Sequence, residues 1–143
     1  MKTPNDQLIS NLARVYLSMH RRIDRAMTEQ GASLARTKLL LYIQDHAGNA
    51  RAADIAELFD QAPRTVTEAL DALEREGLIV RTPDPNDRRV KRLATTDVGD
   101  RAIKATEPLR RQLVDEIFGV LDASESDSLG RALQKLLEAL PVA

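Results

Sequence analysis

The sequence contains no cysteine and no tryptophan, and its aromatic residues are only two tyrosines and two phenylalanines. Without cysteine the chain cannot form disulfides, thiolate metal sites, cysteine nucleophiles or thiol redox sensors. Its two histidines, His20 and His46, are too few for a histidine-rich metal site. We therefore expect neither a metal ion nor a cofactor.

Long hydrophobic runs are also missing. The longest one covers residues 39–43, whereas a membrane-spanning helix needs about 20 apolar residues. Residues 1–6 contain no apolar core of a signal peptide. These features predict a cytoplasmic protein with no membrane partner.

Neither sign of charge dominates. The chain has 21 basic and 22 acidic side chains and a net charge of -1. This balance excludes a uniformly basic coat for nucleic acid but leaves room for a local basic patch. A length of 143 residues with 43% hydrophobic side chains suits one soluble domain, and the abundance of alanine and leucine favours helices.

Apolar periodicity and capping residues predict six helices. The first begins at Thr3 and Pro4, and the last follows Asp122, which has Glu125 three residues on, as in a capping box. The predicted helices cover about residues 4–30, 33–48, 52–59, 63–76, 96–120 and 122–140.

The fifth predicted helix contains a proline. Pro108 should kink or break it near Glu107, because proline lacks an N–H donor and its ring clashes with the preceding turn. Only Gly119 and Gly130 are expected inside helices, whereas the remaining glycines are expected at helix ends or turns.

A β-hairpin is predicted between the fourth and fifth helices. Residues 78–82 are rich in β-branched side chains, residues 83–87 are dense in turn formers, and residues 88–93 return as a second strand. The chain is therefore expected to be mainly α-helical with a small hairpin.

Two short helices near the middle of the chain indicate a helix-turn-helix. Residues 55–58 are joined by a turn of about four residues to residues 64–70. In such a motif the start of the second helix enters the major groove of DNA. The exposed side chains there would be Arg64, Thr65, Thr67 and Glu68. An ordinary helical hairpin with a solvated face is the alternative.

The hairpin adds positive charge beside this motif. Residues 81–92 contain five basic and two acidic side chains, a local net charge of +3 in a slightly acidic protein. A basic hairpin beside a helix-turn-helix could reach the DNA backbone or a minor groove. A solvated β-turn is the alternative.

These segments together resemble the MarR family of bacterial winged-helix regulators. The most specific string runs from Leu73-Glu74 through Gly77-Leu78-Ile79 to Asp84-Pro85-Asn86-Asp87-Arg88-Arg89. The resemblance covers nearly the whole chain. The other segments that resemble the family are residues 55–58, 65–67, 70–72 and 96–99.

The resemblance implies a six-helix winged helix-turn-helix that forms an obligate-type homodimer. Residues 1–31 and 96–143 would form the intertwined dimerisation helices, and residues 32–95 the DNA-binding unit. Two units would bind half-sites of a pseudo-palindromic operator about 34–36 Å apart. The apolar stripes expected at the interface are Leu8, Leu12, Val15, Leu129, Leu133, Leu136, Leu137 and Leu140.

The resemblance also assigns roles within the hairpin, or wing. Asp87 should hold its turn, and Arg88 or Arg89 should enter the minor groove. Lys91 and Arg92 depart from the more apolar second strand of the family, which raises the expected affinity for phosphate. Glu68 departs from an often basic position and could accept from cytosine N4 or face solvent.

A small phenolic or other aromatic carboxylate is the effector class that the resemblance implies. Such ligands bind in a crevice between the dimerisation helices and the winged unit. The alternative for His20 is a surface or half-buried residue that binds no ligand. The candidates are Tyr16, Met19, His20, Ile23 and Arg36.

The leading hypothesis is a DNA-binding transcriptional regulator, in particular a repressor that its effector releases. The alternative is a winged-helix module that binds protein and not DNA. A small hydrolase, which would need a paired nucleophile and base, ranks last, and no catalytic residues are expected.

Overall fold

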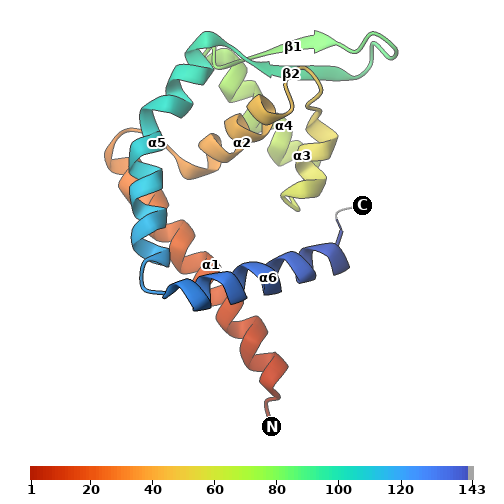
Figure 1. The fold of residues 1–143 in the computed structure, drawn as a ribbon. Coiled ribbons are helices and arrows are strands. Elements are labelled where there is room, and N and C mark those ends of the chain that lie inside the picture. The colour runs from red at the N-terminus through yellow and green to blue at the C-terminus, as the bar shows by residue number, and fades with distance from the viewer. Residues whose placement is uncertain (142–143) are drawn as a thin grey trace.

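A computed structural model describes residues 1–141, which form six helices and one two-stranded antiparallel sheet (Figure 1). The prediction of a mainly helical chain with a small hairpin is confirmed. The elements are α1 (Pro4–Glu29), α2 (Leu34–Asp45), α3 (Ala52–Leu58), α4 (Pro63–Arg75), β1 (Ile79–Pro83), β2 (Lys91–Thr95), α5 (Asp97–Phe118) and α6 (Ala123–Ala139).

Side-chain caps fix the starts of the first and last helices. Thr3 Oγ1 accepts from the Asp6 N–H at 3.2 Å, and the Asp6 carboxylate accepts from the Thr3 N–H at 2.8 Å. Asp122 and Glu125 form the same reciprocal pair at α6. Both predicted capping sites are confirmed.

The hydrophobic core lies between α2, α3, α4 and the hairpin. Ile43, Ile55 and Leu70 are fully buried, and Leu93 of β2 is 1% exposed. Burying an aliphatic side chain of this size stabilises the fold by about 1.5–3 kcal/mol. These contacts hold the helix-turn-helix and the hairpin together as one unit.

Both strands lie further along the chain than predicted. The first is shifted by one residue, and the second begins at Lys91 rather than Arg88. The reason is a closed turn: the Asp84 N–H donates to the Val90 carbonyl at 2.8 Å, and the Val90 N–H donates to the Asp87 carbonyl at 3.0 Å. Residues 88–90 therefore belong to the wing turn.

The predicted break at Pro108 is wrong, because α5 runs unbroken from Asp97 to Phe118. Arg110 bridges the turn around the proline. Its Nη2 donates to the Ile103 carbonyl and its Nε to Thr106 Oγ1, both at 3.2 Å. Ile103 and Thr106 are themselves buried, so packing against the core supports the helix at this point.

The prediction for the glycines is wrong for Gly119, which is the C-cap of α5 rather than a residue inside it. Gly99 lies in the first turn of the same helix, at its start. Only Gly130 is inside a helix as expected. Gly99 is buried, and a Cβ on it would overlap the backbone carbonyl oxygen of Leu78. This position admits only glycine without a shift of α5 away from the start of β1.

The outer helices leave broad apolar faces uncovered within this chain. Residues 4–18 of α1 and all residues of α6 are exposed. Leu8 is 67% exposed and Leu137 is 65% exposed. In Figure 1 the N-terminal part of α1 projects away from the winged unit, and α6 extends from the far end of α5. Within residues 1–141 no helix is both long and apolar enough to cross a membrane.

Candidate nucleic-acid interface

A tight turn joins α3 to α4 as in a helix-turn-helix. Asp60 takes the left-handed conformation with a φ of 49°, which aspartate tolerates better than most residues. The Gln61 N–H then donates to the Ala56 carbonyl at 2.9 Å, which closes the end of α3. Pro63 starts α4 at a position where proline costs no hydrogen bond.

The first two turns of α4 present a polar face. Arg64, Thr65, Thr67 and Glu68 are all exposed, while Val66 is fully buried on the opposite side. Arg64 Nε lies 3.4 Å from Glu68 Oε1, so the two charged side chains pair along the helix. The structure therefore brings the four predicted residues together on one accessible surface.

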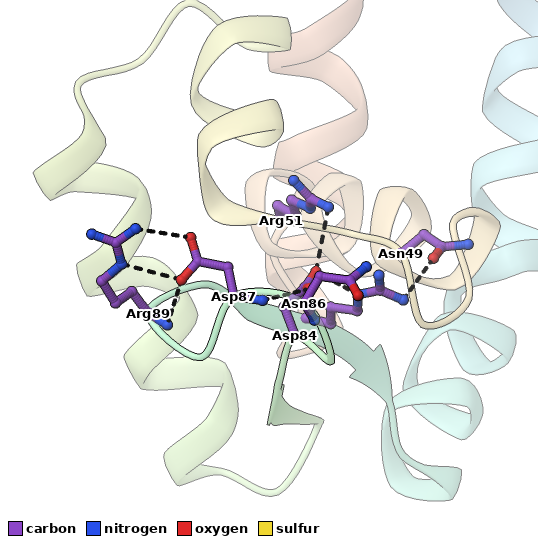
Figure 2. A network of polar contacts seen from close by, with 7 residues as sticks. Asn49, Arg51, Asp84, Asn86, Asp87 and Arg89 are labelled. Atoms are coloured by element: carbon purple, nitrogen blue, oxygen red, sulfur yellow. Dashed lines mark hydrogen bonds and ion pairs between the residues drawn. The ribbon is translucent and has the colours of Figure 1, made fainter.

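The wing turn is organised around Asp84 (Figure 2). Its Oδ1 accepts from the backbone N–H groups of Asn86 at 2.8 Å and Asp87 at 3.2 Å. Its Oδ2 accepts from Arg92 Nε at 2.8 Å and Arg51 Nη2 at 3.3 Å. The Arg92 contact, followed by the Asn86 N–H, holds the pKa of the Asp84 carboxyl below its usual range.

Asp87 contributes to the wing turn beside Asp84. Its carbonyl accepts from the Val90 N–H at 3.0 Å, and its carboxylate accepts from the N–H and the Nε of Arg89, both at 3.1 Å (Figure 2). Asp87 thus also orients the Arg89 side chain. The buried carboxylate of Asp84 supplies the other side-chain contacts that close the turn.

Part of the positive charge of the wing is already paired. Arg81 contacts Asp71 at 2.9 Å and Glu74 at 3.0 Å, and Arg92 contacts Asp84. Among residues 1–141, Arg88 and Lys91 form no ion pair, and both side chains are exposed. These two cations are the ones most available to an anionic partner.

Three of the predicted effector residues line one cleft of about 310 Å³: Tyr16 and His20 from α1 and Arg36 from α2. Lys38 Nζ donates to Tyr16 Oη at 3.0 Å, and Arg36 forms an ion pair with Glu76 at the end of α4. The other lining residues are Ala35, Lys38, Leu39, Phe59, Gln61, Thr65 and Ala69.

Met19 and Ile23 do not line this cleft. Met19 lines a separate cavity of about 510 Å³ between α1 and the end of α5, beside the ion pair of Arg22 with Glu116. Ile23 is half-buried and lines neither cavity.

Sequence reasoning missed Arg51, Asp84 and Arg92 as one network. A usable signal was present, because Asp followed by Pro-Asn is a frequent Asx turn in which the carboxylate caps the N–H two residues on. Arg51 carries no such local signal, because it lies 33 residues away from Asp84.

Comparisons with known proteins agree on one family. The sequence model of the MarR family matches residues 34–91. The HTH-type transcriptional repressor MdtR of Bacillus subtilis (strain 168) is 32% identical over 140 residues, which cover 94% of this chain and 88% of the repressor.

Two solved structures share the fold. The S. aureus MepR–DNA complex matches with a TM-score of 0.76 and 22% identity, and covers 97% of this chain and 99% of the MepR chain. CouR from Rhodococcus jostii RHA1, bound to p-coumaroyl-CoA, matches with a TM-score of 0.78 and 23% identity, and covers 95% of each chain. The expected winged-helix fold is confirmed.

Proposed function

The chain belongs to the MarR family of transcriptional regulators, and on this premise we propose that it is a repressor that binds a pseudo-palindromic operator in double-stranded DNA as a homodimer. The observation that carries the proposal is the exposed polar face of α4 beside a wing with two exposed cations, Arg88 and Lys91, that form no ion pair within the described residues 1–141. Such a protein acts in the bacterial cytoplasm, where the chromosome lies.

The polar face of α4 would supply sequence recognition. Arg64, Thr65, Thr67 and Glu68 would lie in the major groove, where arginine pairs with guanine and glutamate with cytosine. Arg88 or Arg89 would enter the neighbouring minor groove, and Lys91 would bind phosphate. MepR, which shares the fold, forms a complex with DNA.

The uncovered apolar faces of α1 and α6 support the homodimer. In one chain these leucines face water, and a second copy would bury them by the same symmetric contact. Residues 1–31 and 96–143 would then form the dimerisation region, and residues 32–95 the DNA-binding unit. The interface would include Leu8, Leu12, Val15, Leu129, Leu133, Leu136, Leu137 and Leu140.

The cleft at Tyr16, His20 and Arg36 supports release by a small aromatic or anionic effector. Lys38 offers positive charge, Arg36 would offer it on leaving its ion pair with Glu76, and Tyr16 and Phe59 offer aromatic surface. CouR was solved with p-coumaroyl-CoA bound. An effector here would act by changing the separation of the two α4 helices. Met19 and Ile23 would contribute only through a rearrangement of α1.

A protein-binding winged helix is the second candidate. The net charge of -1 favours it, as does the pairing of Arg81, Arg89 and Arg92 with carboxylates. This candidate predicts no salt-sensitive binding to duplex DNA.

Fluorescence-anisotropy titration against duplexes from the gene's own upstream region tests the proposal, with a random duplex as control. We expect tight binding to one upstream duplex that weakens with salt, and much weaker binding to the random one. Equal, weak binding to all duplexes, with and without a panel of aromatic carboxylates, would contradict it and favour the protein-binding module.

A further inference from the structure

Two arginines share one buried carboxylate at the start of the wing turn. Asp84 is 4% exposed, and its Oδ2 lies 2.8 Å from Arg92 Nε and 3.3 Å from Arg51 Nη2. One arginine is sufficient to neutralise the carboxylate. The second therefore leaves this group with a net charge of +1 beside the wing turn.

The two guanidinium groups differ in exposure and in the number of N–H donors that protein contacts use. Arg92 is 26% exposed and also donates from Nη1 to Asn49 Oδ1 at 3.2 Å. Arg51 is 48% exposed, and within residues 1–141 its only hydrogen bond from the side chain is the one from Nη2 to Asp84. A guanidinium has five N–H donors, so most donors of Arg51 have no protein partner within residues 1–141.

Arg51 connects the helix-turn-helix to the wing turn. It directly precedes α3, the first helix of the helix-turn-helix, and its side chain reaches the carboxylate that closes the wing turn (Figure 2). If α4 lies in the major groove and the wing in the next minor groove, one sugar–phosphate strand separates the two grooves. That strand would pass between the helix-turn-helix and the wing, where Arg51 lies.

We propose that Arg51 binds a backbone phosphate of this intervening DNA strand, with Asp84 as the positioning residue that holds its guanidinium in place. This inference rests on the proposed function. Arginine suits the role because its planar fork matches two phosphate oxygens. The contact to Asp84 orders the side chain in advance, which lowers the entropy that DNA binding would otherwise cost.

The first test is the salt dependence of DNA binding for Arg51→Gln, measured by fluorescence anisotropy on the tightest upstream duplex between 50 and 200 mM salt. Each lost phosphate contact should lower the slope of log K against log[salt] by about 0.9. Two subunits lose two contacts. The fall in affinity between the lowest and the highest salt concentration should therefore be about 12-fold smaller for the variant than for the wild type. Arg51→Lys should restore most of the slope.

Arg111→Gln is the matched control. Arg111 lies on α5, is 70% exposed and also pairs with a carboxylate, that of Glu107. The slope of log K against log[salt] for Arg111→Gln should equal that of the wild type. An unchanged slope for Arg51→Gln, with normal binding by the wild type, would overturn the inference and leave the proposed function intact. Absence of salt-dependent binding by the wild type would contradict the proposed function itself.

A second test separates a phosphate contact from a merely structural role in the wing. Single phosphates of the duplex are neutralised in turn as methylphosphonates, and binding is measured for the wild type and for Arg51→Gln. One phosphate in each half-site should matter to the wild type and no longer matter to the variant. If neutralising each phosphate changes the affinity of Arg51→Gln by the same factor as that of the wild type, Arg51 contacts none of these phosphates. That result would overturn the inference.

Discussion

Replacing Gly99 with alanine should destabilise the protein, although helix propensity predicts the opposite. Gly99 is buried in the first turn of α5. A methyl group there would overlap the Leu78 carbonyl oxygen and lie 3.1 Å from the carbonyl carbon. The carbonyl cannot easily turn away, because it accepts from the Thr96 N–H at 3.1 Å. The start of α5 must therefore move.

The cost follows from the bonds that this movement breaks. Thr96 donates to the Leu78 carbonyl, and its Oγ1 donates to the Gly77 carbonyl at 2.6 Å. A shift of about 1 Å would take both bonds out of range, at about 1 kcal/mol each. Distortion of the Thr96 N-cap adds about 1 kcal/mol, and the better helix propensity of alanine returns about 1 kcal/mol. The net loss should be about 2 kcal/mol.

Urea denaturation at a fixed protein concentration measures this loss for Gly99→Ala against the wild type. Ala105→Gly, at an exposed position of the same helix, is the control, and it should cost about 1 kcal/mol through helix propensity alone. A Gly99→Ala variant as stable as the wild type, or more stable, would refute the argument that the Leu78 carbonyl excludes a side chain.

Three further perturbations address the interface, the wing and pH. Leu133→Asp should yield monomers by multi-angle light scattering, because the carboxylate would be buried between the copies; an intact dimer would contradict the proposed interface at α6. Arg88→Ala should weaken duplex binding with little change in the free energy of unfolding, since the side chain is exposed and unpaired; unchanged affinity in an anisotropy titration would contradict the wing assignment. Asp84→Asn should destabilise the protein by a constant amount from pH 8 to pH 5. Because the pKa of Asp84 is lowered in the folded state, its stabilising contribution is complete above its unfolded pKa of about 3.9 and is lost progressively as the pH falls from there through the folded pKa. The difference in stability from the wild type should therefore begin to shrink below about pH 4 in urea titrations, and a gap that stays constant from pH 5 down to pH 3 would contradict the role of the ionised form.

Local signals in the sequence predicted most of the helices correctly. Thr3 and Asp122 cap their helices through neighbours three residues away, so the sequence itself contains both partners of each contact. The same is true of the apolar face of α4, where Val66 and Leu70 are fully buried. Predictions that depended on such short-range contacts could be made without a structure.

Predictions failed where side-chain contacts that the apolar pattern does not reveal decide the outcome. Arg110 and the buried residues around it keep α5 intact despite Pro108. The start of β2 depends on how the Asp84 carboxylate folds the turn, which no alternation of apolar and polar residues reveals. The roles of Asp84 and Arg51 emerge only once the residues that precede α3 lie beside the wing.

The effector cleft shows an intermediate case. Tyr16 and His20 lie four residues apart on α1, so their shared face was predictable from helical spacing. Met19 also lies on α1 but turns toward α5, and the sequence offers no way to tell which neighbour each side of α1 meets. Lys38 and Phe59 join the cleft through packing between helices.

Because α5 is one continuous helix, a tilt of this helix moves the wing relative to the far end of the molecule. Its 22 residues correspond to a length of about 33 Å. A tilt of the whole helix by about 5° about one end would displace the other end by about 3 Å. In the proposed dimer the displacements of the two α5 helices would add to about 6 Å, against a half-site spacing of about 34–36 Å. A motion too small to disturb any single contact in the core could thus decide whether both α4 helices fit the same DNA.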